Sequence, residues 1–163
     1  MKFRRSQKKG FTLFEIMMVV GIIGIIGAIG IPSMMRMFDK EGMRKAVSDF
    51  VEACSHARAA SIFSGGVAEV VMNPIEGTFS IQASSSSESS RALSFRGQFP
   101  PEVRIEIMGV NFIEMQEAEE ARIRFFPNGT SDEFAMILRS DSGEFRKVTL
   151  DVVTGLAEVE RVR

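Results

Sequence analysis

The side chain that stands out first in this sequence is a single carboxylate, Glu15, near the start of a long apolar stretch. Between Phe11 and Met35 it is the only charged residue. An ionisable group in an apolar segment of membrane length costs at least ~2.5 kcal/mol at the helix centre, and it indicates a functional site by default. A carboxylate and an ammonium left alone in lipid are each costly, and pairing them offsets both costs. Glu15 is therefore the first candidate functional residue.

The remaining residue types offer little catalytic chemistry. Cys54 is the only cysteine and His56 the only histidine, so the chain can form neither an internal disulfide nor a zinc site of the usual Cys/His kind. There is no Gly-x-Ser-x-Gly elbow, no Walker loop and no metal-ligand spacing. We interpret Cys54 as a small core residue and His56 as structural or solvated. The sequence predicts no catalytic, cofactor-binding or metal-binding residues, and hence no enzyme.

The element that must position Glu15 is the apolar stretch itself. Phe11 to Met35 would form about 37 Å of helix, enough to cross the roughly 30 Å hydrocarbon core of a bilayer. Five basic residues and no acidic ones precede it, which keeps that end cytoplasmic (Lys2, Arg4, Arg5, Lys8, Lys9). A secretory signal peptide is one alternative, but the stretch is long and lacks a small-x-small cleavage site. A plain signal anchor is another, and it leaves Glu15 unexplained.

The residues around Glu15 carry a resemblance to a known family. Lys9-Gly10-Phe11-Thr12-Leu13-Phe14-Glu15, followed by the apolar stretch, resembles the class III signal of type IV pilins and type II secretion pseudopilins. The resemblance implies that a prepilin peptidase cleaves between Gly10 and Phe11 and that Phe11 is then N-methylated. It also implies that Glu15, as fifth residue of the mature chain, meets the terminal amine of a neighbouring subunit during assembly.

Net charge and cysteine content further narrow the class of pilin-like protein to which the chain is similar. Residues 1–10 hold five of the 20 Lys and Arg and none of the 21 Asp and Glu, so the mature chain has 15 against 21, a difference of −6. Such an acidic chain argues against nucleic acid as a partner, because phosphate neutralisation drives that affinity. Many major type IV pilins carry a C-terminal disulfide, and its absence here favours a pseudopilin or a minor pilin.

Small residues and a proline interrupt the apolar stretch. Gly21, Gly24, Gly27 and Gly30 fall every three residues and would trace a narrow ribbon of bare backbone along a helix. Small residues let membrane helices approach each other closely, although a merely tolerated glycine content is the alternative. Pilin-like proteins commonly have a proline at the place of Pro32, so we expect a bend there rather than the end of the helix.

Residues 36–65 are expected to continue as an amphipathic helix. One apolar stripe recurs at steps of three and four residues (Met43, Val47, Phe50, Val51, Cys54, Ala57). Charged residues such as Arg44 and Glu52 occupy the other faces. Ser64-Gly65-Gly66 predicts the end of this helix.

From Val67 the apolar period changes to two, which predicts strands. Eight are expected, at 67–72, 78–83, 91–95, 103–108, 122–126, 134–139, 145–151 and 156–162. The loops include a Ser-rich segment at 84–90 and an acidic cluster at Glu114, Glu117, Glu119 and Glu120. We interpret the cluster as a solvated loop or short helix, with a cation or partner site as the alternative.

The fold class that follows is α+β, pilin-like, with a long N-terminal helix packed on antiparallel β-sheets. The helix would have a membrane half and an amphipathic half. The expected organisation is a cytoplasmic leader at 1–10, a transmembrane and filament-core helix at 11–35, an amphipathic helix at 36–65 and a periplasmic β domain at 66–163.

A second, looser resemblance lies in the C-terminal part. Ile123-x-Phe125-x-Pro127-x-Gly129-Thr130 and the later Thr154-Gly155 are similar to the minor pseudopilin H family, the GspH/FimT-like class. This implies a structural minor pseudopilin of a type II secretion system, anchored in the inner membrane by one helix. Its partners would be other pseudopilins or pilins, the prepilin peptidase and the membrane.

The alternative is a minor pilin of a type IV pilus, some of which bind DNA for uptake. That function needs a basic patch, for which Arg146-Lys147 is only a short signal.

Overall fold

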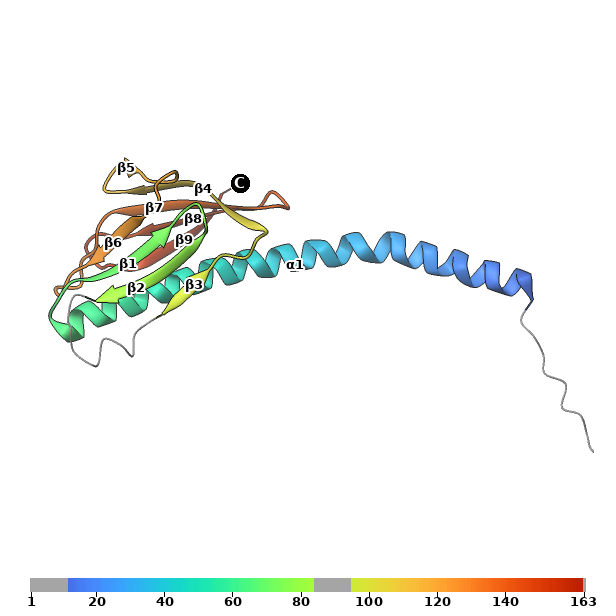
Figure 1. The fold of residues 1–163 in the computed structure, drawn as a ribbon, viewed down its shortest axis with the longest axis horizontal. Helices are drawn as coiled ribbons and strands as arrows, with labels where there is room; N and C mark the ends of the chain where they lie inside the picture. The colour runs from blue at the N-terminus through green and yellow to red at the C-terminus, as the bar shows by residue number, and fades with distance from the viewer. Residues whose placement is uncertain (1–11, 84–94, 163) are drawn as a thin grey trace, which may run out of the picture. The chain divides into compact units, whose positions relative to one another are not determined.

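The computed structural model of the chain describes residues 12–83 and 95–162, with residues 29–40 described by their backbone alone. One helix and nine strands lie in these ranges. They are α1 (Leu13–Ser64), β1 (Ala68–Asn73), β2 (Thr78–Ala83), β3 (Arg96–Gln98), β4 (Val103–Val110), β5 (Ile113–Glu114), β6 (Ala121–Phe125), β7 (Phe134–Ser140), β8 (Phe145–Leu150) and β9 (Ala157–Val162). Figure 1 shows them in chain order.

Contacts divide the chain into two compact units, Met1–Met37 and Phe38–Arg163, and α1 contributes to both. In the first unit, the described residues from Leu13 onward are all helical, including the backbone of Gly30 and Pro32. In the second unit, α1 continues to Ser64, and Gly65 follows with a φ of 67°. A left-handed glycine directly after a helix is a common stop signal, and the end predicted from Ser64-Gly65-Gly66 is therefore confirmed.

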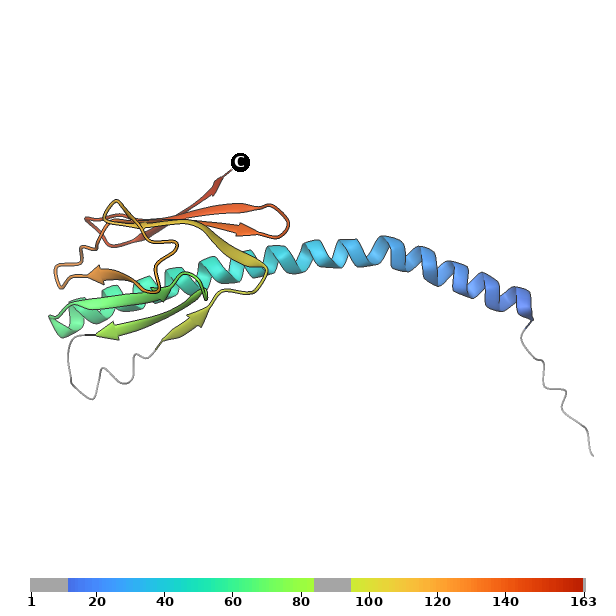
Figure 2. The same ribbon diagram turned by 45° about the horizontal axis from the view of Figure 1, so that its top comes forward.

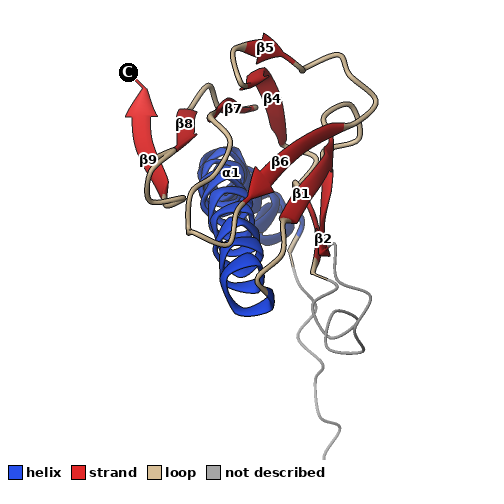
Figure 3. Cartoon of the chain, turned by 90° about the vertical axis from the view of Figure 1, so that its left-hand side faces the viewer, coloured by secondary structure: helices blue, strands red, loops and turns tan. Residues whose placement is uncertain are grey.

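Two antiparallel sheets complete the second unit. One has four strands in the order β3-β2-β1-β6, and the other has five in the order β5-β4-β7-β8-β9. Figures 1 and 2 show both sheets beside the part of α1 that belongs to this unit. Figure 3 looks nearly along α1 and shows the strands in an arc, from β2 at one end to β9 at the other. The predicted α+β class, a helix on antiparallel sheets, is confirmed.

The core of the second unit lies between α1 and the two sheets. The helix buries one stripe of small and apolar side chains there (Met43, Ala46, Phe50, Ala53, Cys54, Ala57, Ala60). Phe50 reaches both sheets, since its ring centroid lies 5.5 Å from that of Phe79 in β2 and 5.3 Å from that of Phe134 in β7. The predicted stripe is confirmed at Met43, Phe50, Cys54 and Ala57, while Val47 and Val51 are only partly buried.

One feature in each sheet differs from the sequence predictions. Most of the strand predicted at 91–95 lies outside the described residues, and β3 instead covers Arg96–Gln98, between two of the predicted strands, with Gly97 at its centre. A Cβ at residue 97 would collide with the ring of Phe79, the residue paired with Gly97 across the strands. Glycine is therefore accommodated in this short strand because an aromatic ring occupies its side-chain space. The hairpin turn at Asn111-Phe112 was not predicted, and both residues have positive φ, 50° and 64°.

Candidate assembly interface

The candidate site begins at the N-terminus of α1. The Glu15 amide donates a hydrogen bond to Thr12 Oγ1 at 3.2 Å, and the Ile16 amide donates to the Thr12 carbonyl oxygen, also at 3.2 Å. Thr12 is thus the N-cap of the helix, and Glu15 stands three residues later in the first turn. A carboxylate in the first turn also favours the helix because it lies near the positive end of the dipole. Thr12 is not among the functional residues predicted from the sequence, although its spacing Thr-x-x-Glu is the signature of a capping box.

The surface around Glu15 is exposed and apolar. Among the described side chains from Thr12 to Ala28, Glu15 is the only charged one, and every residue is exposed except Gly27, which is partly buried. Leu13 is 80% exposed and Phe14 75%. Six of the next apolar residues are also at least half exposed (Ile16, Met17, Met18, Val20, Ile22, Ile23). Large apolar surfaces of this kind mark sites of contact with another protein or with a membrane.

The glycines in this segment face open space. A Cβ added at Gly21, Gly24 or Gly27 would meet no atom within 4 Å outside the local helix backbone. No contact inside the first unit therefore requires glycine at these three positions. Gly10 and Phe11, the predicted cleavage site, lie outside the described residues, and so do the surroundings of Gly30 and Pro32. Within residues 12–83 and 95–162, no helix is both long and apolar enough to span a membrane.

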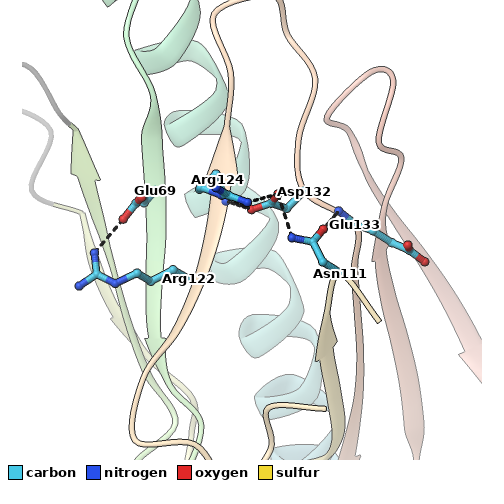
Figure 4. Close-up of polar contacts among 6 residues, drawn as sticks. All are labelled: Glu69, Asn111, Arg122, Arg124, Asp132 and Glu133. Atoms are coloured by element: carbon cyan, nitrogen blue, oxygen red, sulfur yellow. Dashed lines mark hydrogen bonds and ion pairs between the residues drawn. The ribbon is translucent and has the colours of Figure 1, made fainter. Parts of the chain in front are cut away.

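The second unit holds a buried carboxylate, Asp132, which connects the two sheets (Figure 4). Its side chain is 7% exposed, and it accepts hydrogen bonds from Arg124 Nε at 2.8 Å and from the Arg124 amide at 3.0 Å. Asn111 Nδ2 donates to its other oxygen at 3.1 Å, and Asn111 Oδ1 accepts from the Glu133 amide at 3.1 Å. Arg124 belongs to β6 of one sheet and Asn111 follows β4 of the other, so this cluster is a structural bridge.

The ionisation of Asp132 reflects this environment. Burial by itself would raise the pKa of its carboxyl group, because the charged form loses contact with water. The hydrogen bonds from Arg124 and Asn111 outweigh burial and hold the pKa below its usual value. Glu69 and Arg122, also drawn in Figure 4, form a separate and more exposed pair with 2.8 Å between Oε2 and Nη1. Neither cluster was predicted from the sequence, because no local pattern marks pairs so distant along the chain.

The two turns of the C-terminal motif meet at the end of α1. Arg58 Nε donates to the carbonyl oxygen of Thr154 at 2.6 Å, and a Cβ at Gly155 would lie 2.7 Å from the carbonyl oxygen of Gly129. Ser61 Oγ, which is buried, lies 3.1 Å from the Phe126 carbonyl oxygen and can donate to it. The glycines at 129 and 155 both have positive φ. This part of the motif therefore serves to fix two turns on the helix.

The other candidate residues are the lone cysteine, the lone histidine and the acidic cluster. Burial raises the pKa of the Cys54 thiol to about 12, although a backbone hydrogen bond lowers it somewhat, so the reactive thiolate is suppressed. His56 lies 3.5 Å from Glu52 Oε1 and stacks on Phe95. The acidic cluster is exposed, with Glu114 in β5 and the other three carboxylates in the loop before β6. Among the described residues, no three His, Cys, Asp or Glu side chains gather as a metal site.

Comparison with known proteins adds two findings. Residues 5–31 match the family model of the prokaryotic N-terminal methylation motif. The structure is similar to that of the minor pseudopilin EpsH from the type 2 secretion system of Vibrio cholerae, with a TM-score of 0.50 and 11% sequence identity over 75% of this chain and 96% of that one. A search of curated protein sequences found no match. The chain therefore combines a prepilin-type methylation motif with a pilin-like fold, as predicted.

Proposed function

We propose that this chain is a minor pseudopilin, a structural subunit that assembles into the periplasmic pseudopilus of a type II secretion system. The observation that carries the proposal is the exposed apolar surface of residues 12–28, with Glu15 as its one charge, inside the N-terminal methylation motif. Such a surface suits contact with lipid before assembly and with neighbouring helices afterwards. The fold shared with EpsH supports a minor pseudopilin rather than an enzyme.

The proposal includes processing and topology. The prepilin peptidase cleaves after Gly10, and Phe11 becomes the methylated N-terminus. Before assembly, the apolar segment from Phe11 to Met35 anchors the chain in the inner membrane by a single pass. The basic residues of the leader keep the N-terminus in the cytoplasm, and residues 66–163 fold in the periplasm. Gly21, Gly24, Gly27 and Gly30 let neighbouring helices approach, and Pro32 marks a bend.

Glu15 has the decisive role in this proposal. Its carboxylate pairs with the terminal amine of an adjacent subunit, which compensates both charges in an apolar environment. Thr12 holds Glu15 in the first helical turn, close to the N-terminus that cleavage would create. Breaking a buried ion pair costs about 3–5 kcal/mol, or roughly two to three and a half decades in an association constant.

The experiment is crosslinking of the full chain to sibling pilin-like subunits in membranes. Glu15→Val should insert, be cleaved and fold, yet lose its crosslinks, while Glu15→Asp should be intermediate because it keeps the charge but shortens the reach. Glu41→Val is the matched control, since Glu41 is an exposed acid of α1 outside the apolar stretch. Gly10→Val should accumulate as the uncleaved precursor and so provide a size marker for processing. Wild-type crosslinking by Glu15→Val would refute the role of Glu15.

The type IV pilus alternative, with DNA uptake, lacks an observation in its favour. The short basic pair at Arg146-Lys147 lies among acidic residues, because Arg146 Nη2 is 2.8 Å from Glu144 Oε1 and Lys147 stands opposite Glu160 in the strand register.

A further inference from the structure

The outer strand of the five-stranded sheet, β9, has an open edge. Among residues 12–83 and 95–162, only β8 pairs with it, over all six residues from Ala157 to Val162. The other terminal strands of the two sheets in the described part of the chain are shorter, and the uncovered part of β4 has a register irregularity between Ile105 and Ile107. β3 has three residues and β5 two, while the last residue of β6 is bridged to Ser131. An open edge of six residues can accept another strand, and proteins usually cover or shorten such an edge.

The register shows which backbone groups are available at this edge. The Asp151 amide donates to the Leu156 carbonyl oxygen at 3.0 Å, which makes these two residues a hydrogen-bonded pair at the start of the β8–β9 ladder. Hydrogen-bonded and non-hydrogen-bonded pairs alternate along an antiparallel ladder. Glu158, Glu160 and Val162 therefore bond to β8. Ala157, Val159 and Arg161 direct their N–H and C=O groups to the open edge.

The side chains of β9 divide between two faces in the same alternating way. Ala157 and Val159 stand opposite the buried Leu150 and Val148, on the face that contains the core. Glu158 and Glu160 lie on the opposite face, across from Thr149 and Lys147. Both glutamates are exposed, and Val159 is 41% exposed even though it lies on the core face. A strand added at this edge would therefore meet Ala157, Val159 and then Arg161 on one face, and the two carboxylates on the other.

These charges argue against a second copy of the chain as the occupant. In the antiparallel register centred on Val159, which pairs residues 157–161 of the two copies, Glu158 of each copy would stand directly opposite Glu160 of the other. Like charges directly opposite each other destabilise a pair of strands. Lys147 is the only basic residue opposite either glutamate on β8, and Glu158 faces the neutral Thr149 instead. The edge is thus complementary to basic side chains, which β9 does not provide on the face of Glu158 and Glu160 because Arg161 lies on the other face.

We propose that β9 is a docking edge for an extended segment of another polypeptide in which apolar and basic residues alternate. The segment adds a sixth strand to the sheet and bonds to the outward backbone groups of Ala157, Val159 and Arg161. Its apolar side chains cover Val159, and its basic side chains lie beside Glu158 and Glu160. This binding uses no part of α1, so it is independent of the assembly role proposed for Glu15.

The test uses the full chain in detergent micelles and the peptide acetyl-Lys-Val-Lys-Val-Lys-Val-amide as the probe. Amide hydrogen exchange, resolved by residue, should slow at Ala157, Val159 and Arg161, whereas the amides that already bond to β8 should change little. A peptide with Glu in place of Lys should bind about fivefold more weakly. Glu158→Lys should remove or reverse that preference.

Val159→Pro should weaken peptide binding about tenfold, because it removes the central outward N–H without breaking a bond to β8. Arg96→Pro is the matched control, because Arg96 is an exposed residue of the edge strand β3. The Ile81 amide donates to the Phe95 carbonyl oxygen, so Phe95 is in a hydrogen-bonded pair with β2. The next residue, Arg96, therefore directs its N–H away from β2. Equal protection by the acidic peptide, or unchanged binding by Val159→Pro, would overturn the proposal. Concentration-dependent protection of β9 without peptide would identify a second copy as the occupant and would also overturn it.

Discussion

The helix α1 contains two apolar surfaces with opposite environments. Between Leu13 and Ile26 its large side chains are exposed, with Leu13 at 80%. Between Met43 and Ala60 a stripe of the same helix is buried against two sheets, and Phe50 has no exposed surface. Apolar surface that is buried inside a domain stabilises the folded state of the chain. Apolar surface that stays exposed contributes a favourable free energy only when a lipid or another protein covers it. The first surface is therefore suited to assembly and the second to folding.

The two regions also use glycine differently. Gly24 faces open space within its own unit, so a requirement for glycine there can come only from a neighbouring molecule. Gly155 sits at a φ of 63° with a carbonyl oxygen in the space of its missing Cβ, so the fold itself requires it. Substitutions in the first region should change assembly and leave folding alone, and substitutions in the second should do the reverse. Five predictions follow from this difference.

The largest effect is expected for Phe50→Ala. The residue is fully buried between rings of both sheets, so its truncation should lower the free energy of unfolding by about 3–5 kcal/mol. Ile22→Ala is the matched control in the exposed region and should change it by less than about 0.5 kcal/mol. Because the chain has no Trp or Tyr, unfolding in urea is best followed by circular dichroism. Equal losses in both variants would mean that the two surfaces do not differ.

The next effect concerns the bridge between the sheets. Asp132→Ala should lower the free energy of unfolding by about 1.5–3 kcal/mol, because it leaves the donors of Arg124 and Asn111 without their charged acceptor. Asp141→Ala is the control. Asp141 is 58% exposed and lies 3.8 Å from Arg104, a geometry that contributes about 0–1 kcal/mol. A loss no larger than that of Asp141→Ala would refute the bridge.

The same bridge predicts a pH dependence. The pKa of Asp132 is lower in the folded chain than its ordinary value, so the unfolded chain binds more protons in acid. The stabilisation by Asp132 is therefore complete above the ordinary pKa near 4, and it is lost as pH falls through the lower folded pKa. Urea titrations at a series of pH values should show a shallower acid loss for Asp132→Ala than for the wild type. Parallel curves would contradict the assignment.

Much of this architecture follows from local pattern, and the rest depends on contacts between distant residues. The stripe at Met43, Phe50, Cys54 and Ala57 was predictable because helical periodicity is local, and the prepilin-type motif because its residues are contiguous. We missed Ala46, Ala53 and Ala60 on the same face because alanine gives a weak apolar signal. The turn at Asn111-Phe112 contains no glycine that would have predicted it. Its conformation is held instead by hydrogen bonds that Asn111 makes with Glu133 and Asp132. Asp132 could not be assigned because its partners are 8 and 21 residues away.

Gly155→Ala should lower the free energy of unfolding by about 1–2 kcal/mol, which is less than the loss expected for Asp132→Ala. The left-handed conformation disfavours a Cβ, and the carbonyl oxygen of Gly129 lies 2.7 Å from where it would be. Gly143→Ala separates these two causes, because Gly143 also has a positive φ, 82°, but faces open space. The loss should therefore be larger at residue 155 than at residue 143. Equal losses would show that the contact between the two turns contributes nothing.

The smallest effect is expected for Gly24→Ala, and it should appear in assembly rather than in folding. Within its own unit the added methyl meets no atom within 4 Å, and alanine favours a helix over glycine, so the chain should fold at least as well as the wild type. If neighbouring helices approach at the glycines, the methyl overpacks that contact by about 1 kcal/mol and lowers the yield of crosslinked siblings about fivefold. Ile22→Val is the control, because it removes one methylene group from the face of the helix opposite Gly24. Were the glycines merely tolerated, both variants would crosslink like the wild type, and close approach of helices along the ribbon would be ruled out.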